Sequence, residues 1–315
     1  MQPFHPNWKL LEELRQRFLE EKFSGGSYWK ESETLVQYDH TFAERIGWKW
    51  RAVLGELAER QCAPRNPITL VDWGCGTGIA SRTFLQVFDP DQVARLVLWD
   101  RSPLAIEYSK KRIQDQYPQI EITSGLERLS NVDFSLCISH VLNELSPREL
   151  DSLLLLVQKA DWLVWIEPGT PKLSQALIRV REQLRSSFEV VAPCPHQGAC
   201  GLIAKNTQDW CHFFAPPPSS VFQSSQWSEF SQRLGIDLRA LPTSFLVCVR
   251  KQSPNWVIPR LSKTTRVLGR ARHYRGYSQA LTCSAAEVTE TKFMARDQSQ
   301  AIDIIKQKTI TQWVG

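Results

Sequence analysis

The spacing of hydrophobic residues changes near residue 68 of the chain. Before this point, leucine and aromatic residues recur every three or four positions, as on one face of an amphipathic helix. After it, short apolar runs alternate with amphipathic segments, which is typical of an α/β sheet covered by helices. The apolar runs predict seven strands, at 68–73, 96–100, 120–123, 134–139, 162–167, 188–192 and 244–249.

Further elements follow from the same spacing. We expect a helix over 171–187, a short helix around 226–234 and two strands that flank a turn near Arg275. The run Gly25-Gly26-Ser27 interrupts the helical spacing near the N-terminus. The predicted organisation is an N-terminal helical segment at 1–66, a sheet domain at 67–250 with a cysteine-rich insert at 193–240, and a C-terminal module at 251–315.

A glycine-rich turn follows the first predicted strand, in the run Asp72-Trp73-Gly74-Cys75-Gly76-Thr77-Gly78. Glycines at alternate positions let the backbone approach a ligand closely, and the helix that follows offers unpaired N–H groups. Asp100 ends the next strand, where an acid can hold ribose hydroxyls. A glycine turn without a ligand is the alternative. A dinucleotide-binding dehydrogenase is disfavoured, because its third glycine normally falls one residue later.

These residues resemble the motif of class I S-adenosylmethionine-dependent methyltransferases. The resemblance implies a seven-stranded Rossmann-like sheet whose last strand is antiparallel to the rest. It also implies that the loop from Gly74 to Gly78 backs the methionine part of the cofactor, and that Asp100 binds its ribose. The candidate cofactor-binding residues are Asp72, Gly74, Cys75, Gly76, Gly78, Asp100, Arg101 and Ser139.

The segment after the fourth predicted strand supplies candidate substrate-side residues. His140, Asn143 and Glu144 follow this strand at the sheet edge where open α/β folds bind ligands. His140 could act as a general base or could shape the pocket. The Asn/Asp-Pro-Pro-aromatic element of amino-directed nucleic-acid methyltransferases is absent, and neither Cys137 nor Cys194 fits the position of a cytosine-C5 nucleophile. No catalytic residue is therefore assigned.

Three of the eight cysteines, Cys194, Cys200 and Cys211, lie within eighteen residues, among prolines and glycines. Cys283 is the remaining cysteine in polar surroundings and could supply a fourth thiolate. Four thiolates suit Zn²⁺ or an iron–sulfur cluster, and the spacing does not choose between them. His196 or His212 could replace one of the cysteines in a zinc site, and buried cysteines without a ligand are the alternative to a metal site.

The positive charge of the chain is concentrated near its C-terminal end. The net charge is +5, yet residues 248–286 hold eight Lys and Arg residues and no acid. Such a surface suits a phosphate backbone, and a solvated surface is the alternative. The chain has no apolar run long enough to span a bilayer and no secretory or transit signal, so we expect a cytoplasmic protein without membrane contact.

A more specific resemblance rests on the cysteine region. The runs Ala192-Pro193-Cys194-Pro195-His196 and Trp210-Cys211-His212-Phe213, with Cys200 between them, are similar to the Rsm22-type small ribosomal subunit methyltransferase-like family. The runs Ile166-Glu167-Pro168-Gly169-Thr170-Pro171, 139–145 and 266–270 are similar to this family as well. The resemblance implies association with the small ribosomal subunit or its rRNA, and a [4Fe–4S] cluster with Cys194, Cys200, Cys211 and Cys283 as ligands.

These observations support a leading hypothesis and two alternatives. The leading hypothesis is an S-adenosylmethionine-dependent methyltransferase that acts on small-subunit rRNA, monomeric when free, with Arg266, Arg270, Arg272 and Arg275 as RNA-binding residues. The first alternative is an assembly factor that binds the cofactor and rRNA without turnover. The second is a small-molecule methyltransferase whose basic segment is incidental.

Overall fold

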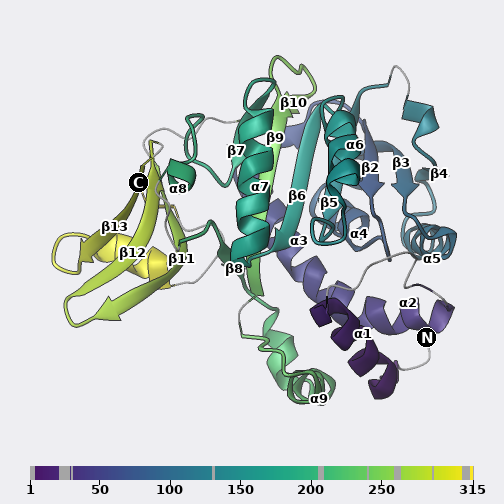
Figure 1. Cartoon of the computed structure of the whole chain (residues 1–315), viewed down its shortest axis with the longest axis horizontal. Coiled ribbons are helices and arrows are strands. Elements are labelled where there is room, and N and C mark those ends of the chain that lie inside the picture. Colours follow the sequence, from purple (N-terminus) through teal and green to yellow (C-terminus); the bar gives the residue numbers. More distant parts are fainter. Residues whose placement is uncertain are drawn as a thin grey trace.

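The computed structural model describes residues 4–20, 29, 31–129, 132–204, 209–239, 241–258, 264–285, 287–306 and 313–314. Its centre is a mixed sheet with the strand order β4-β3-β2-β5-β6-β9-β7, and β8 pairs with β9 (Figure 1). The strands are β2 (Ile68–Trp73), β3 (Val93–Trp99), β4 (Glu121–Ser124), β5 (Phe134–Ser139), β6 (Trp162–Pro168), β7 (Phe188–Ala192), β8 (Phe213–Ala215) and β9 (Leu241–Arg250).

All seven predicted strands are present, within a few residues of the expected bounds. β2, β3, β4, β5 and β6 are joined by parallel pairing. β9 is antiparallel to both β6 and β7, between which it lies. The sequence-based resemblance implies this arrangement, a Rossmann-like sheet whose last strand alone runs the other way, and the described strands confirm it.

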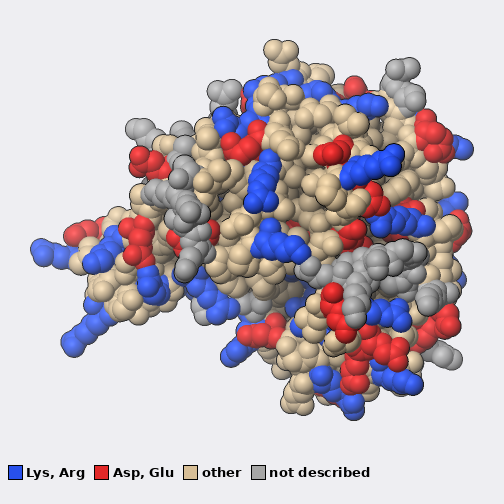
Figure 2. Space-filling view, viewed as in Figure 1, with Lys and Arg blue, Asp and Glu red and all other residues tan. Residues whose placement is uncertain are grey.

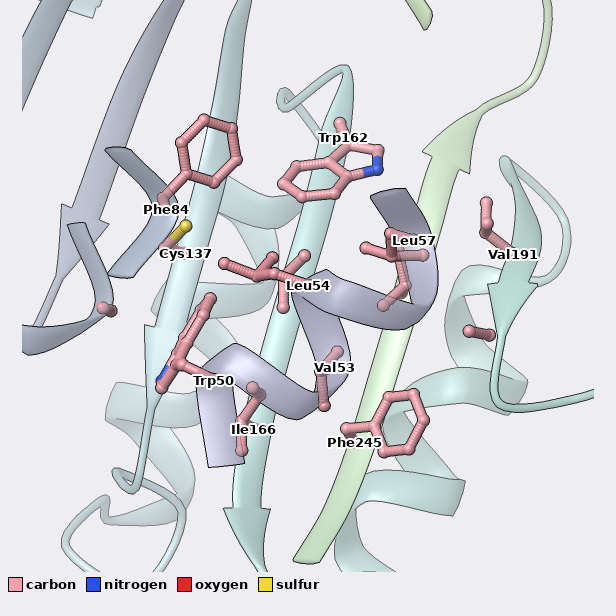
Figure 3. Close-up of a cluster of buried hydrophobic side chains, with 14 of the residues drawn as sticks. Trp50, Val53, Leu54, Leu57, Phe84, Cys137, Trp162, Ile166, Val191 and Phe245 are labelled. Carbon is pink, nitrogen blue, oxygen red and sulfur yellow. The ribbon is translucent and has the colours of Figure 1, made fainter. Parts of the chain in front are cut away.

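Helices cover both faces of the sheet, which explains why the strand sequences are apolar without alternation. On one face, α6 (Pro147–Val157) and α7 (Pro171–Leu184) pack against side chains such as Val71 and Leu136. On the other face lie α3 (Glu44–Glu59), α4 (Ile79–Val87) and α5 (Pro103–Gln114). Figure 3 shows Trp50 and Leu54 of α3 between Phe84 of α4 and the β6 residues Trp162 and Ile166.

The N-terminal helices are fixed to the sheet domain by one buried carboxylate. α1 (Trp8–Glu20), α2 (Ser32–Tyr38) and a π-helical turn at Asp39–Ala43 precede α3. Asp39 in this turn is 3% exposed and accepts hydrogen bonds from Arg82, from Arg112 Nε at 2.9 Å and from Tyr108 at 3.2 Å. Because these donors lie on α4 and α5, Asp39 fixes the N-terminal segment over the sheet edge. The predicted break at Gly25-Gly26-Ser27 lies outside the described residues.

The predicted short helix is α9 (Ser225–Leu234), which packs against α1 through Phe230, Leu11 and Leu14. Several smaller elements, β8 among them, were not predicted from the sequence. β1 (Ala63–Pro64) pairs with β10 (Trp256–Val257), and α8 (Gly201–Ala204) lies in the cysteine-rich segment.

The C-terminal module contains a four-stranded antiparallel sheet with the order β13-β12-β11-β14. The predicted pair of strands is present as β11 (Thr265–Tyr274) and β12 (Tyr277–Ser284), joined at the expected turn. The sequence did not predict β13 (Glu287–Met294), because only Val288 and Phe293 are buried in it and they do not alternate. α10 (Ser299–Lys306) packs on this sheet, and β14 is Trp313–Val314. Figure 1 shows the module extending away from the central sheet.

A buried ion pair joins this module to α3. Arg266 of β11 is 0% exposed, and its Nη1 and Nη2 atoms each donate to one carboxylate oxygen of Glu56 at 2.8 Å. The prediction that Arg266 contacts RNA is therefore wrong, because its guanidinium is buried and paired with Glu56. A bidentate Arg–carboxylate pair has fixed geometry as well as favourable charge, so it orients the module relative to α3.

Replacing Arg266 should therefore lower the stability of the fold. We expect Arg266→Met to reduce the free energy of unfolding by about 3 kcal/mol, because Glu56 would remain buried without its bidentate cation. Chemical denaturation followed by circular dichroism measures this loss. Arg272→Met is the matched control: Arg272 pairs with Glu290 on the surface of the same module, and the expected change is less than about 1 kcal/mol. Equal losses in the two variants would contradict the structural role of the buried pair.

Candidate functional site: a cavity at the carboxyl ends of the parallel strands

A cavity with a volume of about 550 Å³ lies between the sheet edge and the N-terminal helices. It is lined at the carboxyl ends of β2, β3, β5 and β6, where open α/β sheets bind ligands. All but one of the predicted cofactor-binding residues line it: Asp72, Gly74, Cys75, Gly76, Asp100, Arg101 and Ser139. The three substrate-side candidates His140, Asn143 and Glu144 line the same cavity.

The glycine loop is tied to the end of β3 by hydrogen bonds. The carbonyl oxygen of Trp99 accepts from the N–H groups of Gly74 at 2.8 Å and Cys75 at 3.0 Å. Asp100 Oδ2 accepts from the N–H of Gly76 at 2.9 Å, and its Oδ1 accepts from Ser102 at 2.8 Å. Gly74 and Gly76 have φ values of +72° and +51°, a region that favours glycine. The loop and Asp100 thus form one rigid wall of the cavity.

Two of the predicted cofactor-binding residues have supporting positions. Gly78, also with positive φ, lies outside the cavity lining and packs against Ser109 of α5, where a Cβ atom would clash with the Ser109 hydroxyl. Asp72 is 1% exposed, and its Oδ2 accepts from the hydroxyl and the N–H of Ser81 in α4. Burial raises the pKa of Asp72 to about 6. Asp72 therefore connects the cavity floor to the first turn of α4.

The substrate-side segment contains an uncommon backbone conformation. His140 has a φ of +56°, which is rare for a residue with a side chain, and its N–H donates to the carbonyl of Ile166 at 2.9 Å. This conformation places His140 Nε2 3.5 Å from Lys49 Nζ of α3. Burial, and then the charges of Lys49 and Arg45, hold the pKa of His140 well below its usual range. Burial and the two cations thus favour the neutral form of the His140 imidazole.

Two buried titratable residues of this site were not predicted from the sequence. Lys49 is 7% exposed and lines the cavity, and burial lowers its pKa to about 7. Glu167 at the end of β6 is fully buried, and burial raises its pKa to about 7. Its Oε1 accepts from the N–H groups of Val141 and Leu142 at 3.0 and 3.1 Å and from Trp165 Nε1 at 2.7 Å. Glu167 therefore fixes the loop that carries His140.

The sequence carried a signal for both residues. Glu167 ends an apolar strand, as Asp72 and the residue after β3 do, and an acid in that position marks the ligand-binding edge. Lys49 follows Arg45 by one helical turn beside the apolar stripe of α3, so both lie on the same side of the helix. A cation in that position indicates a helix side that faces a polar cavity.

The structure brings the four predicted metal ligands into one region. Cys194, Cys200 and Cys211 line a small cavity of about 30 Å³ beside α7, and Cys283 of β12 has its Sγ 3.5 Å from His196 Nε2. Burial first, and then the other three cysteines, raise the pKa of Cys211 well above its usual value. Among the described residues, however, no group of three or more His, Cys, Asp or Glu side chains is arranged to hold a metal ion. The four-cysteine metal site therefore stays a prediction.

The remaining basic candidates lie on the surface of the C-terminal module. Arg270 lies over the ring of Phe214, with its Cζ 4.5 Å from the ring centroid, and Arg272 pairs with Glu290. Arg275 is exposed at the turn between β11 and β12, next to the stacked rings of Tyr274 and Tyr277. Figure 2 shows Lys and Arg side chains at the outer end of this module, with acidic side chains nearby. Their contact with RNA stays a prediction.

The strand order, the antiparallel strand β9 and the glycine loop at the ligand-binding edge define a Rossmann-like α/β protein with the methyltransferase fold. The model of the family "Mitochondrial small ribosomal subunit Rsm22" matches residues 39–237. The chain therefore belongs to this family. No curated protein matches the chain.

Solved structures of methyltransferases resemble the chain only distantly. A SAM-dependent methyltransferase from Aquifex aeolicus has 14% identity and a TM-score of 0.38, over 52% of this chain and 92% of that one. A precorrin-6y C5,15-methyltransferase from Geobacter metallireducens has 12% identity and a TM-score of 0.38, over 63% of this chain and 86% of that one. Mitomycin 7-O-methyltransferase has 14% identity and a TM-score of 0.41, over 77% of this chain and 68% of that one. At these TM-scores the likeness carries no functional information.

None of the described helices combines the length and the apolar character that a membrane span requires. The cytoplasmic location stays a prediction.

The buried carboxyl of Glu167 should make the stability of the protein depend on pH. Its folded pKa of about 7 lies above the ordinary value of 4.5, so its contribution is fully present below about pH 4.5 and is lost as the pH rises through 7. Glu167→Gln keeps the oxygen that accepts all three hydrogen bonds and does not titrate. Relative to the wild type, the variant should gain up to about 3 kcal/mol between pH 4.5 and 7. Urea denaturation across this range measures the difference, and a constant difference would contradict the burial of a titrating carboxyl.

Proposed function

We propose that the chain binds S-adenosylmethionine in the 550 Å³ cavity and transfers its methyl group to small-subunit rRNA. The observation that carries this proposal is that one cavity contains both the Asp100-bound glycine loop and the basic groups of His140 and Lys49. Membership of a family named for the mitochondrial small ribosomal subunit supports ribosomal RNA as the substrate class.

The residues of the cavity fit this cofactor. A Cβ atom at Gly76 would meet no atom within 4 Å, so the glycine leaves the loop backbone open to a ligand, and Asp100 directly follows β3, where it could accept from ribose hydroxyls. S-adenosylmethionine supplies an electrophilic methyl group, and its transfer requires an aligned nucleophile. His140 and Lys49 are the groups that could accept a proton from the attacking atom, because their pKa values are lowered by burial.

A second candidate function is an assembly factor that binds cofactor and rRNA without turnover. The loop after β5 favours this function. It is fixed by the hydrogen bond to Glu167, with His140 at a positive φ, and it contains no Asn/Asp-Pro-Pro-aromatic element. A rigid loop of this kind can shape a binding pocket without performing chemistry. The two functions differ in one observable, the delivery of the methyl group.

Replacing Asp100 tests the cofactor site and turnover together. With radiolabelled S-adenosylmethionine and isolated small subunits, we expect methyl incorporation into rRNA by the wild type. Asp100→Ala should bind S-adenosylhomocysteine at least about tenfold more weakly, because a half-buried carboxylate acceptor is lost. Asp91→Ala, an exposed acid before β3, is the control and should behave as the wild type. Cofactor binding without any incorporation would favour the assembly factor, and no binding at all would contradict both functions.

We further propose that Cys194, Cys200, Cys211 and Cys283 hold an iron–sulfur cluster, with zinc as the alternative. Four thiols gathered around one buried region suit a cation, because each thiolate disfavours the next. Hydrogen bonds order two of the candidate ligands. Arg181 Nε donates to Cys194 Sγ at 3.1 Å, and the backbone N–H of Cys200 donates to the carboxylate of Glu182. The metal would join the sheet domain to β12.

Anaerobic purification tests the metal directly. We expect a coloured protein with about four iron atoms per chain, and loss of the iron in Cys211→Ser. Cys62→Ser, at a buried cysteine outside this group, is the control and should keep the metal. Absorbance with iron and zinc analysis measures both. A colourless, zinc-loaded protein would contradict the iron–sulfur cluster, and a protein without either metal would contradict the site.

A further inference from the structure

Three cations from the N-terminal helices line the cavity. Arg15 of α1 and Arg45 and Lys49 of α3 all line the cavity, and the two arginines are half-buried. The Nε atoms of Arg15 and Arg45 are buried without a hydrogen-bond partner among the described residues. We call these three residues the cationic wall.

In the described part of the chain, no carboxylate acts on the two arginines of the cationic wall. Burial lowers the pKa of Arg45 to about 10, and the one charged group that contributes further is Arg15, another cation. Arg45 in turn lowers the pKa of Lys49, which only Glu167 opposes. Burying cations without a counter-charge is costly, so this arrangement indicates an anionic ligand.

The cationic wall and the half of the cavity that fits the cofactor come from different elements. Arg15, Arg45 and Lys49 lie on α1 and α3, whereas the glycine loop and Asp100 follow β2 and β3. The anion would therefore lie on the side of these helices, beside the Lys49–His140 pair.

We propose that the cationic wall binds a backbone phosphate of the RNA segment that enters the cavity. A phosphate offers several oxygens, which the guanidinium forks of Arg15 and Arg45 and the ammonium of Lys49 can contact together. Holding that phosphate places the adjoining nucleotide next to His140. This proposal rests on the proposed function for its RNA substrate and adds the residues that receive the strand.

A salt titration tests the phosphate contact. We would measure binding of a fluorescent single-stranded RNA hexanucleotide at several salt concentrations, with saturating S-adenosylhomocysteine, for the wild type, Arg15→Gln and Arg45→Gln. Each variant should bind about tenfold more weakly, and the slope of log K against log salt should become shallower by about 0.7 per lost phosphate contact. Arg17→Gln and Arg51→Gln, at exposed positions on the same two helices, are the controls and should leave the slope unchanged.

The same variants separate the phosphate from the carboxylate of the cofactor. Calorimetry with S-adenosylhomocysteine should give wild-type affinity for Arg15→Gln and Arg45→Gln. Weakened cofactor binding with an unchanged RNA slope would overturn the proposal, because the cationic wall would then hold the cofactor carboxylate. RNA binding with unchanged slopes and unchanged cofactor affinity would also overturn it. Absence of RNA binding by a wild type that binds the cofactor would contradict the RNA substrate itself.

Thermal unfolding without ligands shows that the variants are folded. Because no described carboxylate pairs with Arg45, Arg45→Gln should unfold at the wild-type temperature or above it. A large drop in the unfolding temperature would overturn the view that Arg45 awaits an external anion, because it would show a structural partner inside the fold.

Discussion

The geometry of the cavity depends on the carboxylate of Asp39. The sheet and its glycine loop supply only one side of the site, and the opposite side comes from helices that precede the sheet in sequence. Asp39 is buried and accepts from Arg82, Arg112 and Tyr108, which lie on the two helices that flank the loop. A buried carboxylate needs all of its hydrogen bonds satisfied. The helices before and after Asp39, α2 and α3, therefore have one favourable position relative to α4 and α5. The site is closed by electrostatics as much as by packing.

The sequence predicted the part of the fold that follows from continuous apolar runs. The seven strands could be predicted because most of them are buried on both faces and consist largely of Val, Ile, Leu and other apolar residues, whereas the antiparallel direction of β9 was implied by the resemblance to class I methyltransferases. β13 could not be predicted, because it lies in a small sheet where only Val288 and Phe293 are buried. A strand with two buried side chains has almost no hydrophobic periodicity to detect.

Only the part of the candidate site that lies at the ends of the strands could be predicted from the sequence. Residues next to a motif, such as Asp100 and His140, could be placed because parallel strands end at one edge. The spacing of Arg45 and Lys49 indicates a polar helix side, but not which cavity this side faces, since that depends on how α3 packs against β5 and β6, through Trp50 among others. Arg266 was misassigned for a related reason: a cation in a basic segment looks exposed in sequence, but its partner Glu56 is 210 residues away.

Helix α3 joins two regions that appear unrelated in the sequence. Arg45 and Lys49 lie near its start, and Glu56 lies eleven residues after Arg45, or about 16 Å along a helix that rises about 1.5 Å per residue. The pair between Glu56 and Arg266 attaches the C-terminal module to the far end of this helix. α3 thus acts as a rigid rod between the outer module and the cavity. A displacement of β11 that preserves the ion pair would therefore also move Arg45 and Lys49, which line the cavity.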